Sequence, residues 1–464
     1  MVGKIALTLA LVLVLTCVLA ASNPVPLIYQ PLNPSTVTPG HAAFVLTVHG
    51  TGFVSGAVVK GNGVAFLTKF VDAATLQAEV PPRYVAKAGT GSITVANPGS
   101  IDSNVVYFTI RKPSQSVVLA TDAQTIEGGL MAVADFNNDH VPDLTVTGSN
   151  VDVYLNIDYP RLANFEKVAG PAFTQNILFG PIMVADFNND GNLDVAPCGG
   201  DGGPDPTVCD IYFGDGKGDL TLGTSAQVVY AGVMADINGD GILDNIATWG
   251  DGYESYLSIS LGNGDGTYTN VTTVPTAVPG VPVVGDFNGD GKLDVATSIE
   301  GSSEPGPGTV AVFLGNGDGT VQNEVDYQIP WGGYNAVVAD VNGDGKLDII
   351  TCGFSVLLGN GDGTFSVGTS FDLQDNWNAQ IQVADMNGDG KLDLVTVSSN
   401  FGHGIETLNI LLGSGNGTFR RPIMLPIPLG SSASGIADFN ADGLLDIGLS
   451  GVYQSTVLLQ VPSK

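Results

Sequence analysis

Seven acidic segments with one pattern recur along the chain and constrain its fold more than any other feature. The clearest reads Asp-Phe-Asn-Gly-Asp-Gly-Lys-Leu-Asp from Asp286 to Asp294, with oxygen-bearing side chains at positions 1, 3, 5 and 9. The other six begin at Asp135, Asp186, Asp236, Asp340, Asp385 and Asp438, so successive starts lie 51, 50, 50, 54, 45 and 53 residues apart. A nearly constant period of about 50 residues is typical of propellers and other repeat architectures.

Each acidic segment has the chemistry of a site for a hard cation. Ca²⁺ takes six to eight oxygen ligands, and alternating Asp and Asn side chains on a curled loop, with a backbone carbonyl at position 7, supply them. We therefore expect up to seven structural Ca²⁺ ions. The predicted metal ligands are Asp135, Asn137, Asp139, Asp143, Asp186, Asn188, Asp190, Asp194, Asp236, Asn238, Asp240, Asp244, Asp286, Asn288, Asp290, Asp294, Asp340, Asn342, Asp344, Asp348, Asp385, Asn387, Asp389, Asp393, Asp438, Asn440, Asp442 and Asp446.

Two other interpretations explain the acidic segments less well. A simple turn needs no third and fourth oxygen side chain, and without a cation three neighbouring Asp would repel and raise one another's pKa. An EF-hand or dockerin-like loop needs flanking helices, and the EF-hand needs a Glu at position 12. Position 12 of the loop at Asp286 is Thr297, and the flanking residues 282–284 and 295–297 are typical of strands.

The first loop departs from the pattern. His140 stands where the other six loops have Gly, and Pro142 follows two residues later. His adopts left-handed backbone geometry at some cost, so we expect the loop at Asp135 to bind the weakest ion or none. We interpret His140 as a tolerated turn residue in preference to a metal ligand.

Residues 115–464 have one internal order in each unit. An apolar strand such as 381–384 leads into the acidic loop, strands such as 394–397 and 408–412 follow, and a glycine turn precedes a more polar fourth strand. Four strands repeated seven times predict a seven-bladed β-propeller. We expect segment 116–121 to be the fourth strand of the final blade, beside a third strand at 456–461, so that one sheet joins both ends of the domain.

Residues 23–112 precede the repeats and have a different pattern. Short β-branched runs at 43–48, 57–60, 76–80, 91–95 and 105–110 alternate with Pro and Gly turns. This pattern is typical of a small immunoglobulin-like β-sandwich. The predicted fold class is therefore all-β, a seven-bladed propeller with an N-terminal β-sandwich.

Both parts resemble known families. The seven loops at blade spacing resemble the FG-GAP/VCBS repeat family, whose members include the seven-bladed heads of integrin α subunits. This resemblance implies Ca²⁺ held in the hairpin between the first and second strands of each blade. Segments 47–53 and 95–99 resemble the bacterial IPT/TIG immunoglobulin-like family.

The charge of the chain follows from the same loops. The formal net charge is −30, with 46 acidic and 16 basic residues. The loops contribute 21 of the acids, three Asp in each of seven. Nucleic acid is not an expected partner, because the chain has no basic patch to neutralise phosphates.

The N-terminus predicts export. Lys4 and the apolar run from Ile5 to Ala20 predict a signal peptide over residues 1–21. Cys17 leaves a lipoprotein signal as an alternative. The rest of the chain contains no segment that would span a membrane, so we expect a secreted or cell-surface protein.

Three cysteines remain in the mature chain. Cys198 and Cys209 bracket a Gly- and Pro-rich loop between two neighbouring predicted strands, and an oxidising compartment would allow a local disulfide there. Cys352 follows an apolar strand, so we interpret it as a small buried thiol.

No set of residues typical of catalysis is visible, so we expect that the chain is not an enzyme. The four His are scattered, and we find no Ser elbow, Cys/His pair or phosphate loop. Aromatic residues lie in loops that should face away from the acidic hairpins, beside Asn and Asp, and suit a sugar ring or a peptide side chain. The candidate ligand-binding residues are Trp249, Tyr253, Trp331, Tyr334 and Trp377.

Those residues would equally fit packing between blades. Our main hypothesis is a monomeric calcium-binding adhesion or recognition protein for a glycan or protein ligand. The alternatives are a propeller-based polysaccharide lyase or hydrolase, which the scarcity of Arg after residue 115 disfavours, and a purely structural surface module. The sequence does not identify the ligand.

Overall fold

The fold is all-β. The computed structural model describes residues 24–120, 124–158, 163–173, 182–198, 208–224, 228–250, 254–300, 307–370, 380–400, 405–428, 430–451 and 454–462. These residues form strands β1 to β39 and contain no helix. Accordingly, no helix in this part of the chain is long and apolar enough to cross a bilayer. The predicted signal peptide, residues 1–21, lies outside the described residues.

Two sheets come first and share one core. One has the order β1 (Leu27–Ile28), β3 (Phe44–Thr51), β7 (Thr75–Val80), β6 (Leu67–Asp72), and the other β2 (Thr36–Val37), β9 (Val106–Ile110), β8 (Gly89–Ala96), β4 (Val58–Gly61), β5 (Val64–Ala65). Their inward residues, among them Leu46, Leu76, Ile93 and Phe108, form a single buried cluster. We call residues 24–112 the N-terminal sheet pair. Strands β1, β2, β5 and β6 were absent from the sequence expectation because they are short or alternate between exposed and half-buried residues.

Six four-stranded antiparallel sheets then follow the chain order, each with the strands that the repeat pattern predicts. They are β11 (Met131–Ala134), β12 (Asp143–Thr147), β13 (Val151–Asn156), β14 (Phe165–Val168); β15 (Ile182–Ala185), β16 (Asp194–Pro197), β18 (Tyr212–Gly214), β19 (Leu220–Leu222); β21 (Gly232–Ala235), β22 (Asp244–Gly250), β23 (Ser255–Gly262), β24 (Tyr268–Pro275); β25 (Val283–Gly285), β26 (Asp294–Glu300), β27 (Gly308–Phe313), β28 (Val325–Ile329); β29 (Ala336–Ala339), β30 (Asp348–Thr351), β31 (Ser355–Gly359), β32 (Phe365–Ser370); β33 (Ile381–Ala384), β34 (Asp393–Asn400), β35 (Ile405–Leu411), β36 (Ile423–Ile427).

A seventh four-stranded sheet combines residues from both ends of the repeat region. It has the order β10 (Gln124–Glu127), β39 (Gln454–Leu458), β38 (Asp446–Ser450), β37 (Ser432–Ala437). Gln124 pairs with Val457 and Glu127 with Gln454. The expectation that an early segment completes the last sheet is confirmed, but its position was wrong. The fourth strand is 124–127. Residues 118–120 lie beside residues 459–461, after the end of β39, where Leu119 forms only an isolated bridge to Gln460.

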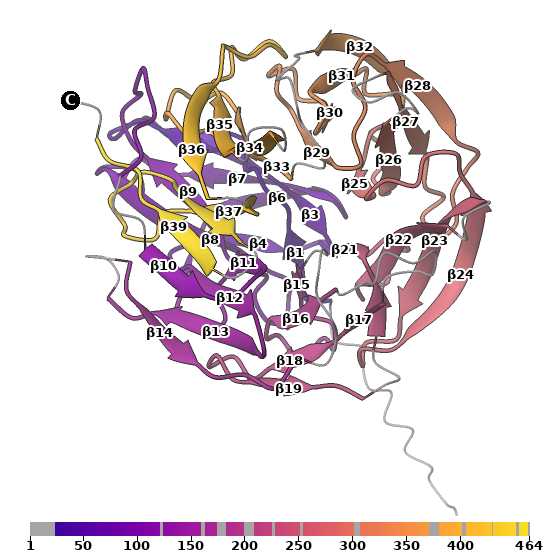
Figure 1. Ribbon diagram of the computed structural model, residues 1–464, viewed down its shortest axis with the longest axis horizontal. Helices are drawn as coiled ribbons and strands as arrows, with labels where there is room; N and C mark the ends of the chain where they lie inside the picture. Colours follow the sequence, from indigo (N-terminus) through magenta and orange to yellow (C-terminus); the bar gives the residue numbers. More distant parts are fainter. Residues whose placement is uncertain are drawn as a thin grey trace, which may run out of the picture.

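The repeat sheets follow one another around a common centre (Figure 1). Buried clusters span consecutive sheets: one joins Ala235 and Ile246 to Val284 and Val295, and another joins Phe287 and Ala296 to Ile349 and Leu357. Small sheets that pack face to face around a centre make a propeller-like fold, as the 50-residue period predicts.

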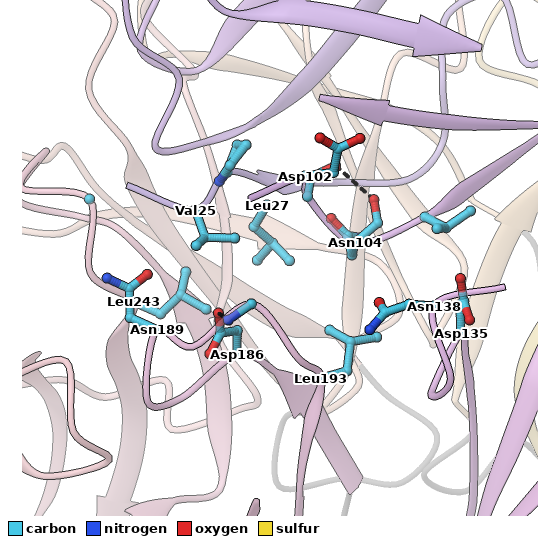
Figure 2. Close-up of a pocket in the computed structure, with 15 residues that line it drawn as sticks. Val25, Leu27, Asp102, Asn104, Asp135, Asn138, Asp186, Asn189, Leu193 and Leu243 are labelled. Atoms are coloured by element: carbon cyan, nitrogen blue, oxygen red, sulfur yellow. Dashed lines mark hydrogen bonds between the residues drawn. The ribbon is translucent and has the colours of Figure 1, made fainter. Parts of the chain in front are cut away.

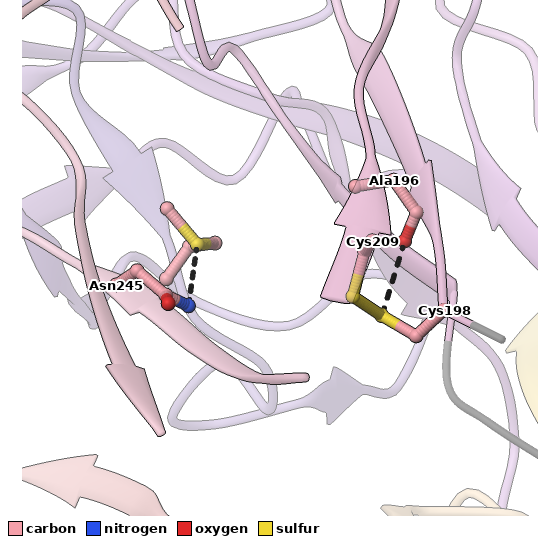
Figure 3. Close-up of a disulfide and its surroundings, with 5 residues drawn as sticks. Ala196, Cys198, Cys209 and Asn245 are labelled. Carbon is pink, nitrogen blue, oxygen red and sulfur yellow. Dashed lines mark hydrogen bonds between the residues drawn. A yellow bond between two sulfur atoms is a disulfide. The ribbon is translucent and has the colours of Figure 1, made fainter. Parts of the chain in front are cut away.

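One repeat carries a disulfide bond. A disulfide joins Cys198 and Cys209, which are 11 residues apart (Figure 3). The two residues also form an isolated β-bridge, Cys198 directly after β16 and Cys209 within β17 (Val208–Asp210). Strand β17 pairs with β20 (Val228–Tyr230). The predicted local disulfide is thus present in the structure. Cys352 is buried at 4 % exposure within an apolar cluster, as expected.

Candidate functional site

All seven acidic segments form hairpins between the first and second strands of a repeat sheet. In the fourth repeat, β25 ends at Gly285, the loop starts at Asp286, and Asp294 opens β26. The residues on both sides are strands, which excludes the EF-hand arrangement for these loops. The structure therefore brings all 28 predicted ligands into seven short loops of one construction.

The aspartate at position 1 organises the curl of each loop. In the fourth loop, Asp286 Oδ1 accepts a hydrogen bond from the N–H of Asp290 at 3.2 Å, and its Oδ2 accepts one from Gly291 at 2.9 Å. The same pair of bonds recurs in the other six loops. Every loop backbone thus wraps around the carboxylate of its first aspartate.

The aspartate at position 9 joins two hairpins. Asp294 accepts the N–H of Phe287 at 2.9 Å through Oδ2 and that of Gly315 at 2.8 Å through Oδ1. Equivalent bonds occur in every repeat, and all seven of these carboxylates are fully buried. Sequence reasoning assigned this residue to the metal alone, whereas it also fixes the sheet.

Two positions in each loop require a positive φ. Position 6 is the glycine of the motif, and His140 takes its place with φ of 68°. This agrees with its interpretation as a tolerated turn residue. Position 4 has the same requirement, which the sequence analysis missed. Four loops meet it with Gly, and the other three use Asn138, Asn189 and Ala441 at φ of 60°, 59° and 55°.

The loop carboxylates are electrostatically strained. Burial, followed by neighbouring Asp charges, raises the pKa of Asp194, Asp393 and Asp446 to about 8 against the backbone N–H bonds that lower it. Burial likewise raises the pKa of Asp186, Asp236, Asp385 and Asp438 to about 6. Buried like charges at this spacing disfavour ionisation unless a cation is near.

The residues fit a hard cation by donor chemistry. In the described residues, no three His, Cys, Asp or Glu side chains are gathered closely enough to hold a metal ion as they are placed. Every loop nevertheless offers Asp and Asn oxygens only, without nitrogen or sulfur ligands. Among described side chains, the salt bridges that reach a loop are His140–Asp135 at 3.8 Å and Lys292–Asp290 at 4.0 Å. The buried acids therefore have almost no basic side chain to neutralise them.

The apolar residue at position 2 links neighbouring sheets. Phe287 packs edge-on against Phe365 of the next sheet, with ring centroids 5.4 Å apart, and its carbonyl accepts the N–H of Gly363 at 3.0 Å. Phe439 of the last loop packs edge-on against Phe165 of the first sheet, with ring centroids 5.8 Å apart, and its carbonyl accepts a hydrogen bond from Asn156 Nδ2 at 2.8 Å. The apolar repeat at position 2 was visible in the sequence, but its partners required the fold.

The candidate aromatic residues lie far along the strands from the acidic loops. Trp249 is near the end of β22, whose first residue is Asp244 of the third loop, and its ring lies 4.6 Å from that of Tyr256. Trp331 and Tyr334 precede β29, which leads into the fifth loop, and Tyr334 is 40 % exposed. Hydrogen bonds from Thr248 to Gly280 and from Val281 to Tyr334 connect these segments. Tyr253 and Trp377 lie outside the described residues.

Two cavities border the acidic loops instead of the aromatic residues. A cavity of about 1100 Å³ lies between residues 27–35 of the N-terminal sheet pair and the first strands of the repeats, including Val184, Val284, Val338 and Val383. A void of about 30 Å³, enough for a water molecule or two, is enclosed by Val25, Leu27, Asn104 and the loops at Asp135 and Asp186 (Figure 2). The N-terminal sheet pair therefore lies against the side of the repeat sheets that carries the acidic loops, which we call the acidic face. This contact was not predicted from the sequence.

Comparison with known proteins finds a repeat family in the middle of the chain. The family model for the FG-GAP-like repeat matches residues 236–297, 298–351 and 353–396. These matches agree with the repeat resemblance but do not include the N-terminal sheet pair. No curated protein matches the chain.

Solved structures give only distant similarities. An auxiliary nutrient binding protein from Bacteroides ovatus is 12 % identical, with 94 % of this chain and 98 % of that one covered and a TM-score of 0.36. BBS1N in complex with ARL6DN is 12 % identical, covers 76 % and 99 %, and has a TM-score of 0.43. The V. cholerae biofilm matrix protein Bap1 is 15 % identical, covers 87 % and 67 %, and has a TM-score of 0.29. None of these similarities is strong enough to transfer a function.

Proposed function

We propose that this chain is a secreted, calcium-stabilised recognition protein. In this proposal the seven repeat sheets are the blades of a closed β-propeller, the N-terminal sheet pair is an immunoglobulin-like domain, and the molecule binds a glycan or protein ligand. The proposal rests on one observation: the same pattern of hydrogen bonds is found in all seven acidic loops. Each network curls an all-oxygen donor set around buried carboxylates that have almost no basic partner.

Calcium would act as a structural ion. Extracellular calcium modules bind with dissociation constants on the order of 10⁻⁴ to 10⁻³ M, so millimolar Ca²⁺ adds about 1 kcal/mol per site by mass action. The loop residues hold and orient the ion, and the ion offsets the repulsion between their carboxylates. Because the position-9 aspartate also bonds the neighbouring hairpin, each ion would stabilise the sheet as well as its loop.

The ligand surface would be at the opposite ends of the strands. The N-terminal sheet pair covers several of the acidic loops, whereas Tyr334 is 40 % exposed and lies in a segment bonded to the neighbouring connection at Val281. Trp331 is held in place through its backbone, which donates to Ser355 Oγ at 3.1 Å and accepts from it at 2.9 Å. Ordered aromatic rings beside polar groups offer the flat contact that sugar rings and peptide side chains use.

Export is consistent with the cysteine chemistry. The disulfide between Cys198 and Cys209 is of the kind that persists in oxidising compartments. Together with the predicted signal peptide over residues 1–21, it supports a secreted or surface location. No observation on the described residues favours an enzymatic activity over binding, so we propose none.

A glycan array with the full mature chain tests the recognition role. We expect binding in millimolar Ca²⁺ that falls at least tenfold in the Trp331→Ala/Tyr334→Ala double variant. Leu67→Ala, an exposed apolar residue on β6, serves as the control and should bind like the wild type. A protein that folds with Ca²⁺ but binds no glycan, and captures no protein ligand through these aromatic residues, would refute the recognition role and favour a purely structural module.

A further inference from the structure

The N-terminal sheet pair is seated on the backbone of several acidic loops. Thr51 Oγ1 exchanges hydrogen bonds with the N–H and carbonyl of Asp236, both at 3.2 Å. Thr90 Oγ1 donates to the Asp438 carboxylate. Two position-6 glycines lie directly against the pair: a Cβ on Gly191 would fall 2.1 Å from Ile101, and one on Gly241 would fall 2.0 Å from Pro24.

The loop at Asp385 is covered at its first four positions by Arg111 and the residues that follow it. Arg111, 5 % exposed, donates through Nη1 to the carbonyl of Met386 at 3.2 Å, and Ser114 N–H donates to the carbonyl of Asn387 at 2.7 Å. The Arg111 stem lies flat on Gly388, where a Cβ would fall 2.7 Å from it. Within this loop Asp385 is 1 % and Asn387 0 % exposed.

The fifth loop is less closely covered and lines the 1100 Å³ cavity between the pair and the repeats. Around Asp340, Gly343 and Gly345 have nothing within 4 Å of where a Cβ would lie. Asp344 at position 5 of this loop is exposed. The fifth and sixth loops are therefore a matched pair, with the same residues at positions 1, 3, 5 and 9, but only the sixth is hydrogen-bonded to residues 111–114, whereas the fifth borders the 1100 Å³ cavity.

Charge favours this seat. Residues 24–112 contain six basic and three acidic residues, whereas residues 113–464 contain nine basic and 43 acidic ones. Arg111 does not neutralise the sixth loop by itself: no salt bridge in the described structure joins it to a carboxylate, and its buried Nε has no hydrogen-bond partner. Arg111 lies close enough to Asp385 and Asp393 to interact with their charges, but its single positive charge faces the three aspartates of this loop, so the loop keeps a negative charge that a cation would offset.

The hydrogen bonds between the N-terminal sheet pair and the acidic loops depend on the backbone conformation of the loops. Arg111 and Ser114 bond to carbonyls of the sixth loop, and Thr51 bonds to the backbone at the start of the third. These groups keep their positions only while each loop remains wrapped around its first aspartate. A cation bound to the loop carboxylates would stabilise this loop conformation. Without the cation the carboxylates would repel one another.

We propose that docking of the N-terminal sheet pair is coupled to calcium in the loops to which it is hydrogen-bonded, at Asp236, Asp385 and Asp438. This inference rests on the calcium sites proposed above. Calcium holds these loops in the conformation that the N-terminal sheet pair binds. Loss of calcium releases the pair and opens the 1100 Å³ cavity between the pair and the repeats. By linkage the seated pair raises calcium affinity in the covered loops by the same factor. The acidic face is therefore a calcium-controlled interface within the chain.

Limited proteolysis of the full mature chain tests the coupling. Trypsin cuts after Arg or Lys, and the Arg111–Lys112 bond is protected while Arg111 is buried on the sixth loop. Pro113 blocks cleavage after Lys112. The measured quantity is the rate at which a fragment ending at Arg111 appears by mass spectrometry, in millimolar Ca²⁺ and in chelator. We expect cleavage to be at least about fivefold faster in chelator.

Two matched variants separate docking from general unfolding. In millimolar Ca²⁺, Asp389→Asn in the covered sixth loop should speed cleavage after Arg111 about fivefold. Asp344→Asn, at the same position of the open fifth loop, should leave that rate as in the wild type. Each variant should bind one calcium ion fewer by native mass spectrometry, and near-UV circular dichroism shows that both remain folded.

The outcomes distinguish this inference from the proposed function. Calcium binding with equal cleavage rates in the two variants would overturn the coupling and leave the calcium sites standing. Absence of calcium binding by the folded wild type would overturn both. Faster cleavage in Asp389→Asn alone supports the coupling.

Discussion

Ala441 is the one alanine that the described structure holds at positive φ, at 55°. It occupies position 4 of the last loop, where four other loops have Gly. An L-residue with a Cβ is strained in this region by about 1 kcal/mol or more, and Gly is not, although Gly costs some entropy in the unfolded chain.

We expect Ala441→Gly to stabilise the protein by about 0.5–1 kcal/mol. The reason is relief of backbone strain with the loss of only one half-buried methyl group. Urea unfolding in saturating Ca²⁺ measures the change. Ala437→Gly, in the extended strand β37, is the control and should destabilise by about 0.5–1 kcal/mol. A loss of stability in Ala441→Gly would show that the loop does not maintain this conformation.

The aspartates at positions 5 and 9 should have separable roles. Asp294→Asn leaves one oxygen and places an amide NH2 against one of the N–H groups of Phe287 and Gly315, so it should destabilise even the metal-free protein by about 1–3 kcal/mol. Asp290→Asn alters an exposed side chain and should mainly lower the calcium count by one. Chemical unfolding in chelator, together with native mass spectrometry, distinguishes them. Equal loss of metal-free stability in both variants would contradict the hairpin-joining role of position 9.

At the scale of the loop, the raised pKa values predict a pH dependence with a definite sign. A carboxyl with a raised pKa in the folded state binds a proton more tightly there than in the unfolded state. Its contribution is therefore most favourable below the unfolded pKa of about 4 and is lost as pH rises through the folded value. For Asp194, Asp393 and Asp446 that value is about 8.

The metal-free protein should consequently lose stability between about pH 4 and pH 8. Saturating Ca²⁺ should flatten this slope because it favours the ionised carboxylates, and calcium binding near pH 7 should release protons. Unfolding curves at several pH values, and calorimetry in buffers with different ionisation enthalpies, measure the two effects. Metal-free stability that rises across this range would contradict the strained carboxylates.

At the scale of the whole molecule, the repeat order and the acidic hairpins could be predicted because both are local. Strand β33 has the predicted bounds of 381–384, and each first strand leads into its loop as expected. The closing strand was misplaced by several residues because segments 118–120 and 124–127 both run beside the last strand, and only the register with Gln454 and Val457 decides between them.

Long-range contacts were beyond the sequence. The seat of the N-terminal sheet pair depends on contacts such as Thr90 with Asp438 and Arg111 with Met386, which are hundreds of residues apart. No periodicity encodes such pairs. The same holds for position 2, where an apolar residue was visible but its partner in the next sheet was not. Trp249, Trp331 and Tyr334 lie away from the acidic loops as expected, but a ligand for them stays a proposal.

Thermal unfolding of the full mature chain in millimolar Ca²⁺ and in chelator tests the central claim most directly. Seven sites at about 1 kcal/mol each should raise the unfolding temperature of the repeat region by about 10 °C. Mg²⁺ at the same concentration should give a much smaller rise, because it dehydrates reluctantly and demands stricter geometry. If the chain unfolds at the same temperature with calcium and with chelator, the acidic hairpins do not hold structural calcium and the account is wrong.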